Sequence, residues 1–235
     1  MVKPQLKLQF AFFYPFIYPL LRLISPNCLW TGNRSRKEIA LTIDDGPHPQ
    51  YTLELLDVLD KYGIKASFFW LGVCVERHPE VAREVYRRGH WIGIHGYQHL
   101  SFTQFKQAEF EQSLEQTKTA IHNVCGLAGD RLQYVRPPNG FFTWETLRLL
   151  TEWGYRTVMW SVVPEDWVEP GADIVASRVL RQTKQGSIIV LHDGYFGGCN
   201  VAASVDQIVP ELLRRGYEFV SIDRLWKEAK GEAQV

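Results

Sequence analysis

The stretch Ile39-Ala-Leu-Thr-Ile-Asp-Asp-Gly-Pro47 contains the clearest structural signal of the chain. Its first five residues are apolar or β-branched, a pattern typical of a buried strand. Two carboxylates and a Gly-Pro pair follow directly, and this combination favours a turn. A helical stripe of leucines and valine comes next, over residues 53–59, and ends near Gly63. The stretch therefore predicts a first β-then-α unit.

The same unit recurs along the chain about seven times in roughly 200 residues. Strands are predicted at residues 39–43, 66–71, 90–94, 133–135, 155–160, 187–191 and 217–221. Between and after them, helical patterns cover residues 53–59, 79–88, 101–123, 144–153, 173–185, 205–215 and 223–230. Strict alternation predicts an α/β fold with a parallel sheet, either open or rolled into a barrel.

Length and composition are consistent with one globular domain of this kind. The chain has 235 residues, of which 46% are hydrophobic and 22% charged, so disorder is excluded as its main state. The 26 basic and 26 acidic residues balance, which argues against a nucleic-acid partner. The four cysteines show no CxxC spacing, and we expect free thiols rather than a zinc knuckle or a redox pair.

The N-terminal segment, residues 1–35, differs from the rest. Between residues 8 and 33 the only formal charge is Arg22, and residues 10–21 are very apolar and aromatic. Pro15 and Pro19 interrupt this run, and no A-x-A site follows, so a cleavable signal is not indicated. The run is also too short to span a membrane. We expect either an interfacial anchor with peripheral membrane contact through residues 8–33, or an arm packed on the domain of residues 36–235.

Polar side chains follow five of the predicted strands. In a βα barrel, residues at the carboxyl ends of different strands meet on one face and form the site there. These residues are Asp44, Asp45, His95, His99, Arg136, Asp166, His192 and Asp193. The sequence thus predicts a cluster of carboxylate, imidazole and guanidinium groups at one rim.

Each of these groups has a plain structural interpretation when it is taken alone. The Asp44–Asp45 pair suits a turn, the two histidines suit surface or core positions, and Arg136 suits a proline turn. Taken together, His95, His99 and Asp45 form a plausible metal site with two imidazoles and one carboxylate. A polar His192–Asp193 pair at the end of an apolar strand is the feature that packing explains least.

Five stretches of the chain, in order, resemble the motifs of the polysaccharide deacetylase family, the NodB-homology domain of carbohydrate esterase family 4. They are Thr42-Ile-Asp-Asp-Gly-Pro47, His95-Gly-Tyr-Gln-His99, Arg136-Pro-Pro-Asn-Gly140, Asp166-Trp167 and Ile189-Val-Leu-His192. The resemblance extends from residue 38 to about residue 225. It implies a single distorted (β/α)7 barrel and a metal-dependent hydrolase that removes acetyl groups from an N-acetylglucosamine-type glycan and releases acetate.

The resemblance also implies a role for each matching residue. Asp44 matches the general base, Arg136 the arginine that orients the base, His192 the general acid, and Asp166 the aspartate paired with that acid. Asp45, His95 and His99 match the ligands of a divalent metal, Zn²⁺ above all, with Co²⁺, Ni²⁺ or Mn²⁺ as alternatives. Trp167 matches the aromatic wall of the sugar site, and the Asn139 backbone N–H matches the donor to the oxyanion.

Three residues depart from the family pattern: Gly96, Leu100 and Val163 replace a hydroxyl residue, a proline and an aspartate. None is an expected metal ligand, and we expect activity to survive. Alternatives are O-deacetylation of a glycan such as acetylxylan, a non-catalytic carbohydrate-binding relative, and a non-haem iron oxygenase. A membrane-associated or extracytoplasmic location is favoured because such glycans lie there. A cytoplasmic location and the oligomeric state stay open.

Overall fold

The computed structural model describes residues 10–231 of the chain, and residues 1–9 of the N-terminal segment lie outside the described residues. Seven strands form its central sheet: β1 Glu38–Asp44, β2 Ser67–Trp70, β3 Trp91–Ile94, β4 Tyr134–Val135, β5 Arg156–Thr157, β6 Ile188–His192 and β7 Glu218–Phe219. Their order is β5-β4-β3-β2-β1-β6, with β7 paired to the beginning of β1. All of these pairings are parallel.

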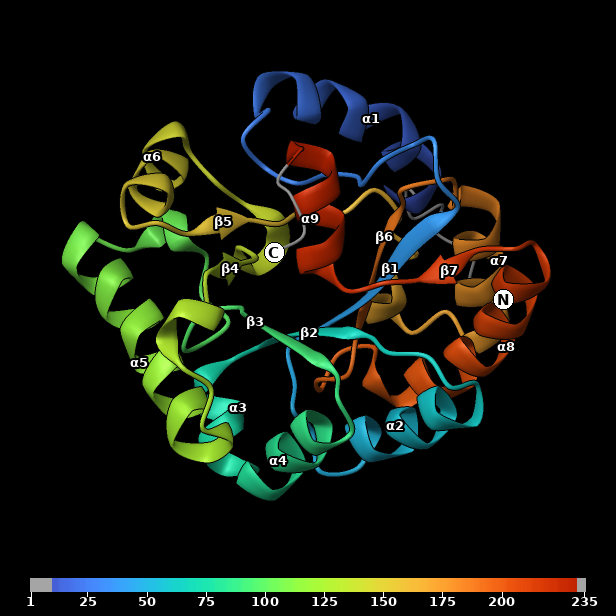
Figure 1. Cartoon of the computed structure of the whole chain (residues 1–235), viewed down its shortest axis with the longest axis horizontal. Coiled ribbons are helices and arrows are strands. Elements are labelled where there is room, and N and C mark those ends of the chain that lie inside the picture. The colour runs from blue at the N-terminus through green and yellow to red at the C-terminus, as the bar shows by residue number, and fades with distance from the viewer. Residues whose placement is uncertain (1–9, 232–235) are drawn as a thin grey trace, which may run out of the picture.

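Helices surround the sheet (Figure 1). They are α1 Phe10–Ile24, α2 Tyr51–Lys61, α3 Gly72–Arg77, α4 Pro79–Arg87, α5 Gln107–Cys125, α6 Trp144–Glu152, α7 Ala172–Gln182, α8 Val201–Arg214 and α9 Ile222–Lys230. All seven residues of β1 are buried, because the sheet is covered on both faces. The distorted (β/α)7 barrel predicted from the sequence is confirmed.

The barrel is distorted between β5 and β6. In the described chain these two strands are joined indirectly: Val158 pairs with Leu29 of the N-terminal segment, and Val162 pairs with Ile189 of β6. Figure 1 shows α1 in the ring of helices between α6 and α7, outside this part of the sheet. The N-terminal segment therefore contributes both a helix and a strand-like contact to the barrel.

Helix α1 forms although it contains Pro15 and Pro19. Proline has no N–H to donate to the carbonyl four residues earlier, so Pro15 leaves the Ala11 carbonyl without its helical donor. The Gln182 side chain of α7 donates to that carbonyl at 3.2 Å. The buried Tyr14 hydroxyl donates to the Trp160 carbonyl at 2.9 Å. Contacts with the barrel thus offset the local cost of proline.

Two helix starts differ by four or more residues from the sequence-based expectation, and α3, like α1, was not predicted as a helix. Helix α5 begins at Gln107 rather than Ser101, because Phe102 turns into the core within a short 3-10 helix. The Lys106 N–H then donates to the Glu109 side chain at 2.9 Å and caps the helix. Helix α8 begins earlier than expected, and the short α3 lacks a periodic apolar stripe long enough to detect.

Within residues 10–231, no helix combines the length and the apolar character needed to cross a bilayer. Cys28, Cys74, Cys125 and Cys199 are all free thiols.

Candidate active site

The predicted site residues meet at the carboxyl ends of the strands because of the sheet register. Asp44 at the end of β1 lies opposite His192 at the end of β6. Ile94 of β3 lies opposite Val135 of β4, so the next residues, His95 and Arg136, are also neighbours. A cavity of about 1170 Å³ opens at this rim. Seven of the nine predicted residues line it: Asp44, Asp45, His95, His99, Asn139, Trp167 and His192.

Arg136 lies behind Asp44 and is completely buried. Its Nη1 atom donates to Asp44 Oδ1 at 2.6 Å and to Thr42 Oγ1 at 2.7 Å. Its Nη2 atom donates to the Met159 carbonyl at 3.1 Å, and the guanidinium stacks over the Phe69 ring at 4.1 Å from the centroid. Burial lowers the pKa of Arg136, while the Asp44 carboxylate opposes that change. The arrangement fixes the orientation of the Asp44 carboxylate.

Asp45, His95 and His99 form a compact group beside Asp44. Their potential ligand atoms all lie within 4.8 Å of one another. Asp45 Oδ1 is 3.3 Å from His95 Nε2 and 3.4 Å from His99 Nε2. His95 Nδ1 is 2.8 Å from the Arg136 carbonyl oxygen, to which it donates, so Nε2 is left as the electron-pair donor.

The donor set fits a divalent cation. Asp45 Oδ1 is buried and has no hydrogen-bond partner among the described residues, which is costly unless a cation occupies the space. Burial raises the pKa of Asp45, but the His95 ring and the neighbouring imidazoles outweigh burial and hold it below its ordinary value. Burial lowers the pKa of His99. An anionic carboxylate and a neutral imidazole are the forms that bind a metal.

His192 and Asp166 form a second polar pair on the other side of the cavity. His192 Nδ1 donates to Asp166 Oδ1 at 2.9 Å, and the His192 backbone N–H donates to Asp166 Oδ2 at 2.7 Å. Burial lowers the pKa of His192, but the Asp166 carboxylate outweighs it, and the pKa rises to about 10. His192 is thus held as a cation near neutral pH. The Trp167 ring is perpendicular to the His192 ring, with an interplanar angle of 87° and a centroid distance of 5.5 Å.

Asn139 lies in the short 3-10 helix Pro138–Gly140, after β4. Its φ of 59° is in the left-handed region, which asparagine tolerates better than most residues. Asp45 also has a positive φ, of 77°. Such strained positions often occur at functional sites. Both residues line the cavity.

Some residues of the site were not assigned a role from the sequence. Asp193, noted there only as part of a polar pair, is buried and accepts a hydrogen bond from Thr52 at 2.5 Å. Burial raises its pKa to about 7. Phe141, Trp144 and Phe196 line the cavity from loops and the start of α6. Their signal in the sequence is the Gly-Phe-Phe-Thr-Trp and Gly-Tyr-Phe runs that follow strand ends.

Comparison with known proteins agrees with this fold. The profile of the polysaccharide deacetylase family matches residues 31–158. A peptidoglycan-N-acetylglucosamine deacetylase of Bacillus cereus is 34% identical over 198 residues, which cover 83% of this chain and 91% of the relative. A chitooligosaccharide deacetylase of Bradyrhizobium is 35% identical over 206 residues, which cover 83% and 92%.

A solved structure shares the fold of this chain. It is a peptidoglycan N-acetylglucosamine deacetylase in complex with 4-naphthalen-1-yl-N-oxidanyl-benzamide, and it superposes with a TM-score of 0.82 at 29% identity, covering 87% of this chain and 95% of the other. The chain therefore belongs to the polysaccharide deacetylase family. It is a hydrolase that acts on carbon–nitrogen bonds other than peptide bonds.

Proposed function

We propose that this protein is a metal-dependent N-deacetylase that converts N-acetylglucosamine units of a glycan to free amino sugars and acetate. One observation carries the proposal: a three-residue ligand group, a buried carboxylate and a charged imidazole line the same cavity. The printed activities of the relatives, on peptidoglycan N-acetylglucosamine and on chitooligosaccharides, support the same substrate class.

Asp45, His95 and His99 would hold the metal, and Zn²⁺ suits two imidazoles and one carboxylate best. Co²⁺, Ni²⁺ and Mn²⁺ are the alternatives. When bound, such an ion supplies a Lewis acid that polarises the acetyl carbonyl and makes water more acidic.

The residues around the ligand group transfer protons, stabilise the developing negative charge and bind the sugar. The Asp44 carboxylate, held by Arg136, takes a proton from the attacking water. The Asn139 backbone N–H donates to the oxygen that becomes negative as the water adds to the carbonyl carbon. His192 then donates its proton to the departing nitrogen, and the carbon–nitrogen bond breaks. The Trp167 ring offers a flat apolar face to the sugar.

The state of His192 favours an amide over an ester substrate. An amine is a poor leaving group unless it is protonated, and His192 is held as a cation by Asp166 at 2.9 Å. O-deacetylation of acetylxylan needs this acid less, because an alcohol leaves more easily. A non-catalytic role is disfavoured because the chain retains the residues that match the base, the acid and all three metal ligands.

Acetate release tests the proposal. Protein loaded with Zn²⁺ should release acetate from chitin oligomers or peptidoglycan faster than from acetylxylan. Asp44→Asn should abolish release while the bound metal, measured by elemental analysis, stays equimolar. Asp57→Asn on the exposed face of α2 is the matched control and should retain activity. Full activity of Asp44→Asn would show that the mechanism is wrong.

We further propose that α1 contacts an anionic membrane surface. A surface helix is normally polar on its outer side, but α1 exposes Phe12, Phe13, Phe16, Ile17, Leu20 and Leu23 there. Residues 1–37 contain six basic and no acidic residues, although the whole chain is neutral. An apolar helix face within a basic segment is typical of interfacial binding to anionic lipid.

Vesicle sedimentation tests this contact. We expect the protein to sediment with vesicles containing phosphatidylglycerol and to bind pure phosphatidylcholine vesicles less. Phe16→Asn combined with Leu20→Asn should abolish sedimentation, whereas Ile174→Asn on α7 should not. If the wild-type protein instead forms a dimer that the double variant disrupts, and binds no vesicles, the surface is a self-association site and this proposal is wrong.

A further inference from the structure

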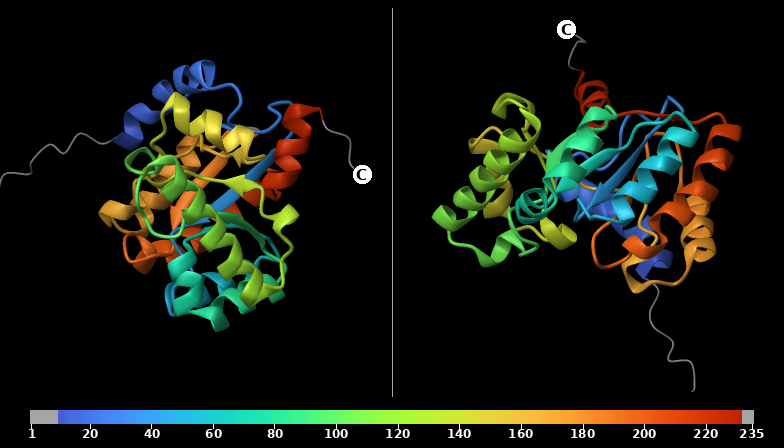
Figure 2. Two further views of the ribbon diagram at one scale, coloured as in Figure 1. Left: turned by 90° about the vertical axis from the view of Figure 1, so that its left-hand side faces the viewer. Right: turned by 90° about the horizontal axis from the view of Figure 1, so that it is seen from below.

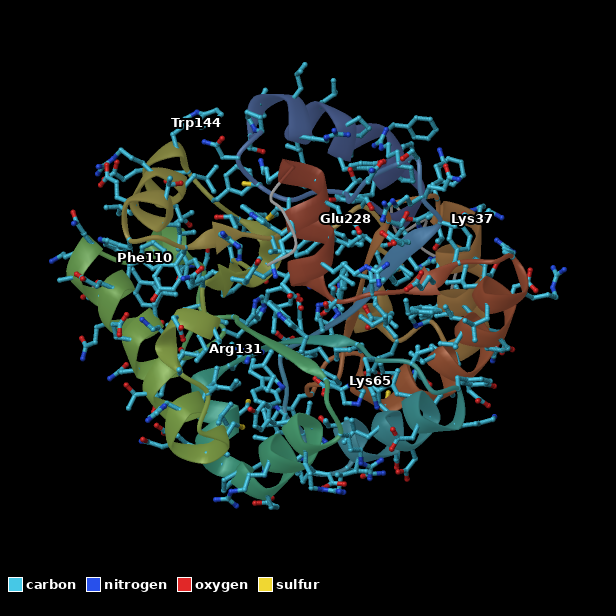
Figure 3. All side chains as sticks on the ribbon, in the orientation of Figure 1. Lys37, Lys65, Phe110, Arg131, Trp144 and Glu228 are labelled. Carbon is cyan, nitrogen blue, oxygen red and sulfur yellow. The ribbon has the colours of Figure 1, made fainter. Side chains whose placement is uncertain are left out.

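The cavity that contains the candidate active site does not end at the sugar-binding residues. It continues to α1, where Tyr14, Leu21 and Ile24 form part of its wall. Trp144 at the start of α6 lines the facing side. Figure 3 shows Trp144 at the rim of the molecule, on the side of α6 toward α1, and the left panel of Figure 2 shows these two helices side by side at the outer surface. A helix outside the five family motifs thus forms a wall of the cavity.

The chemistry of this extension differs from that of the site. Outside the ligand group and its neighbours, the lining is mostly aliphatic and aromatic, with Leu21, Phe141 and Phe142 as examples. A sugar chain needs hydrogen-bond partners for its hydroxyl groups, and buried polar groups without partners are costly. The extension is therefore a poor continuation of a glycan site and a good environment for hydrocarbon.

The rim of the extension is apolar as well. Ile24 is 52% exposed, Trp144 is 65% exposed and Phe196 is 71% exposed. An exposed apolar patch of this kind, continuous with a concave site, marks a surface that becomes covered when a ligand or membrane binds. The volume of about 1170 Å³ also exceeds the range of about 300–1,000 Å³ typical of small-ligand sites.

We propose that the substrate is an amphiphile: an N-acetylated amino sugar whose aglycone carries a hydrocarbon chain, as in a lipid-linked saccharide. The sugar lies at Trp167 and the ligand group, and the chain lies in the extension between α1 and the 141–144 segment. This inference rests on the proposed function. If the acyl group that is removed is acetyl, a long hydrocarbon chain can be attached to the sugar only through the aglycone. The apolar outer face of α1 would keep the enzyme where such lipids occur.

Two soluble substrates with the same sugar test the proposal. They are the methyl and octyl β-glycosides of N-acetylglucosamine, both used below micellar concentrations with the Zn²⁺-loaded protein. Each buried methylene contributes about a fourfold gain in affinity, so burial of two or three methylenes is enough to raise the affinity more than about tenfold. We expect kcat/KM to be at least about tenfold higher for the octyl glycoside. Calorimetry with Asp44→Asn should give the same preference in binding without turnover.

A matched pair of variants locates the effect. Ile24→Asn places a polar group in the wall of the extension, and it should remove most of the octyl preference while activity on the methyl glycoside changes less than twofold. Ile174→Asn is the control, because Ile174 is 48% exposed, close to the 52% of Ile24, and lies on α7 away from the cavity lining. It should leave the preference unchanged.

The possible outcomes separate this inference from the proposed function. Acetate release from both glycosides at similar kcat/KM overturns the lipid-linked substrate and leaves the deacetylase function intact. Preference for N-octanoylglucosamine over the octyl glycoside also overturns it, because the chain then lies on the acyl side. No release from the glycosides or from chitin oligomers contradicts the proposed function. Equal binding of both glycosides to Asp44→Asn rejects the hydrocarbon site in either case.

Discussion

Replacing Asp166 by asparagine should shift the pH dependence of this enzyme, and the structure sets the size of the shift. Asp166 Oδ1 and His192 Nδ1 are 2.9 Å apart. Two unit charges at that separation attract by about 6 kcal/mol at an effective dielectric constant of about 20. The rise of the His192 pKa from 6.5 to about 10 corresponds to on the order of 5 kcal/mol, so the attraction to Asp166 is large enough to account for most of it.

The sign of the effect follows from which form of His192 is active. The imidazolium is the proton donor, so activity is present below its pKa and is lost as the pH rises through it. In Asp166→Asn the opposing effect of burial remains and the carboxylate is gone, so the pKa falls. The alkaline limb of kcat/KM should therefore move to lower pH by about 1–3 units. Asparagine can still accept from the His192 backbone N–H, and the fold should survive.

The assay is acetate release from a chitin oligomer between pH 5 and 10, together with an NMR titration of the His192 ring. Glu165→Gln is the matched control, because Glu165 is a neighbouring buried carboxylate that pairs with Arg178 at 3.5 Å instead. Its profile should equal that of the wild type. An alkaline limb that does not move in Asp166→Asn, while the ring pKa falls, would show that His192 is not the acid.

Three further outcomes are expected from single substitutions. Arg136→Met leaves the buried Asp44 carboxylate without its partner and should lower the free energy of unfolding by about 3–5 kcal/mol in urea denaturation; adding Asp44→Asn should recover part of it. His99→Ala removes one of three ligands and should weaken Zn²⁺ binding, measured by competition with a chelator, while thermal stability of the metal-free protein stays the same. Tyr14→Phe removes the hydrogen bond to the Trp160 carbonyl and should lower the free energy of unfolding by about 1 kcal/mol in urea denaturation; no change would show that this hydrogen bond does not stabilise the docked α1.

Much of the fold was predictable because the signals are local. Alternating apolar strands and amphipathic helices predict a parallel sheet whatever the details of packing. The seven predicted strands all occur within a few residues of their expected positions. The start of α5 was not predictable, because Ser101–Phe105 has helical periodicity but Phe102 is drawn into the core by tertiary contacts. The helix through Pro15 depends in the same way on the Gln182 side chain of a distant element.

The sequence by itself determined the order of β–α units and the polar residues that end each strand, since both depend on neighbouring residues in the chain. Only the tertiary structure decided which of these residues meet. The register of β1 against β6 brings Asp44 opposite His192, and the turn after β3 brings His95 and His99 to Asp45. The tertiary structure also placed α1 against the cavity. Tyr14 and Trp144 line the same cavity although they are more than a hundred residues apart, so this wall depends on packing and not on a local sequence pattern.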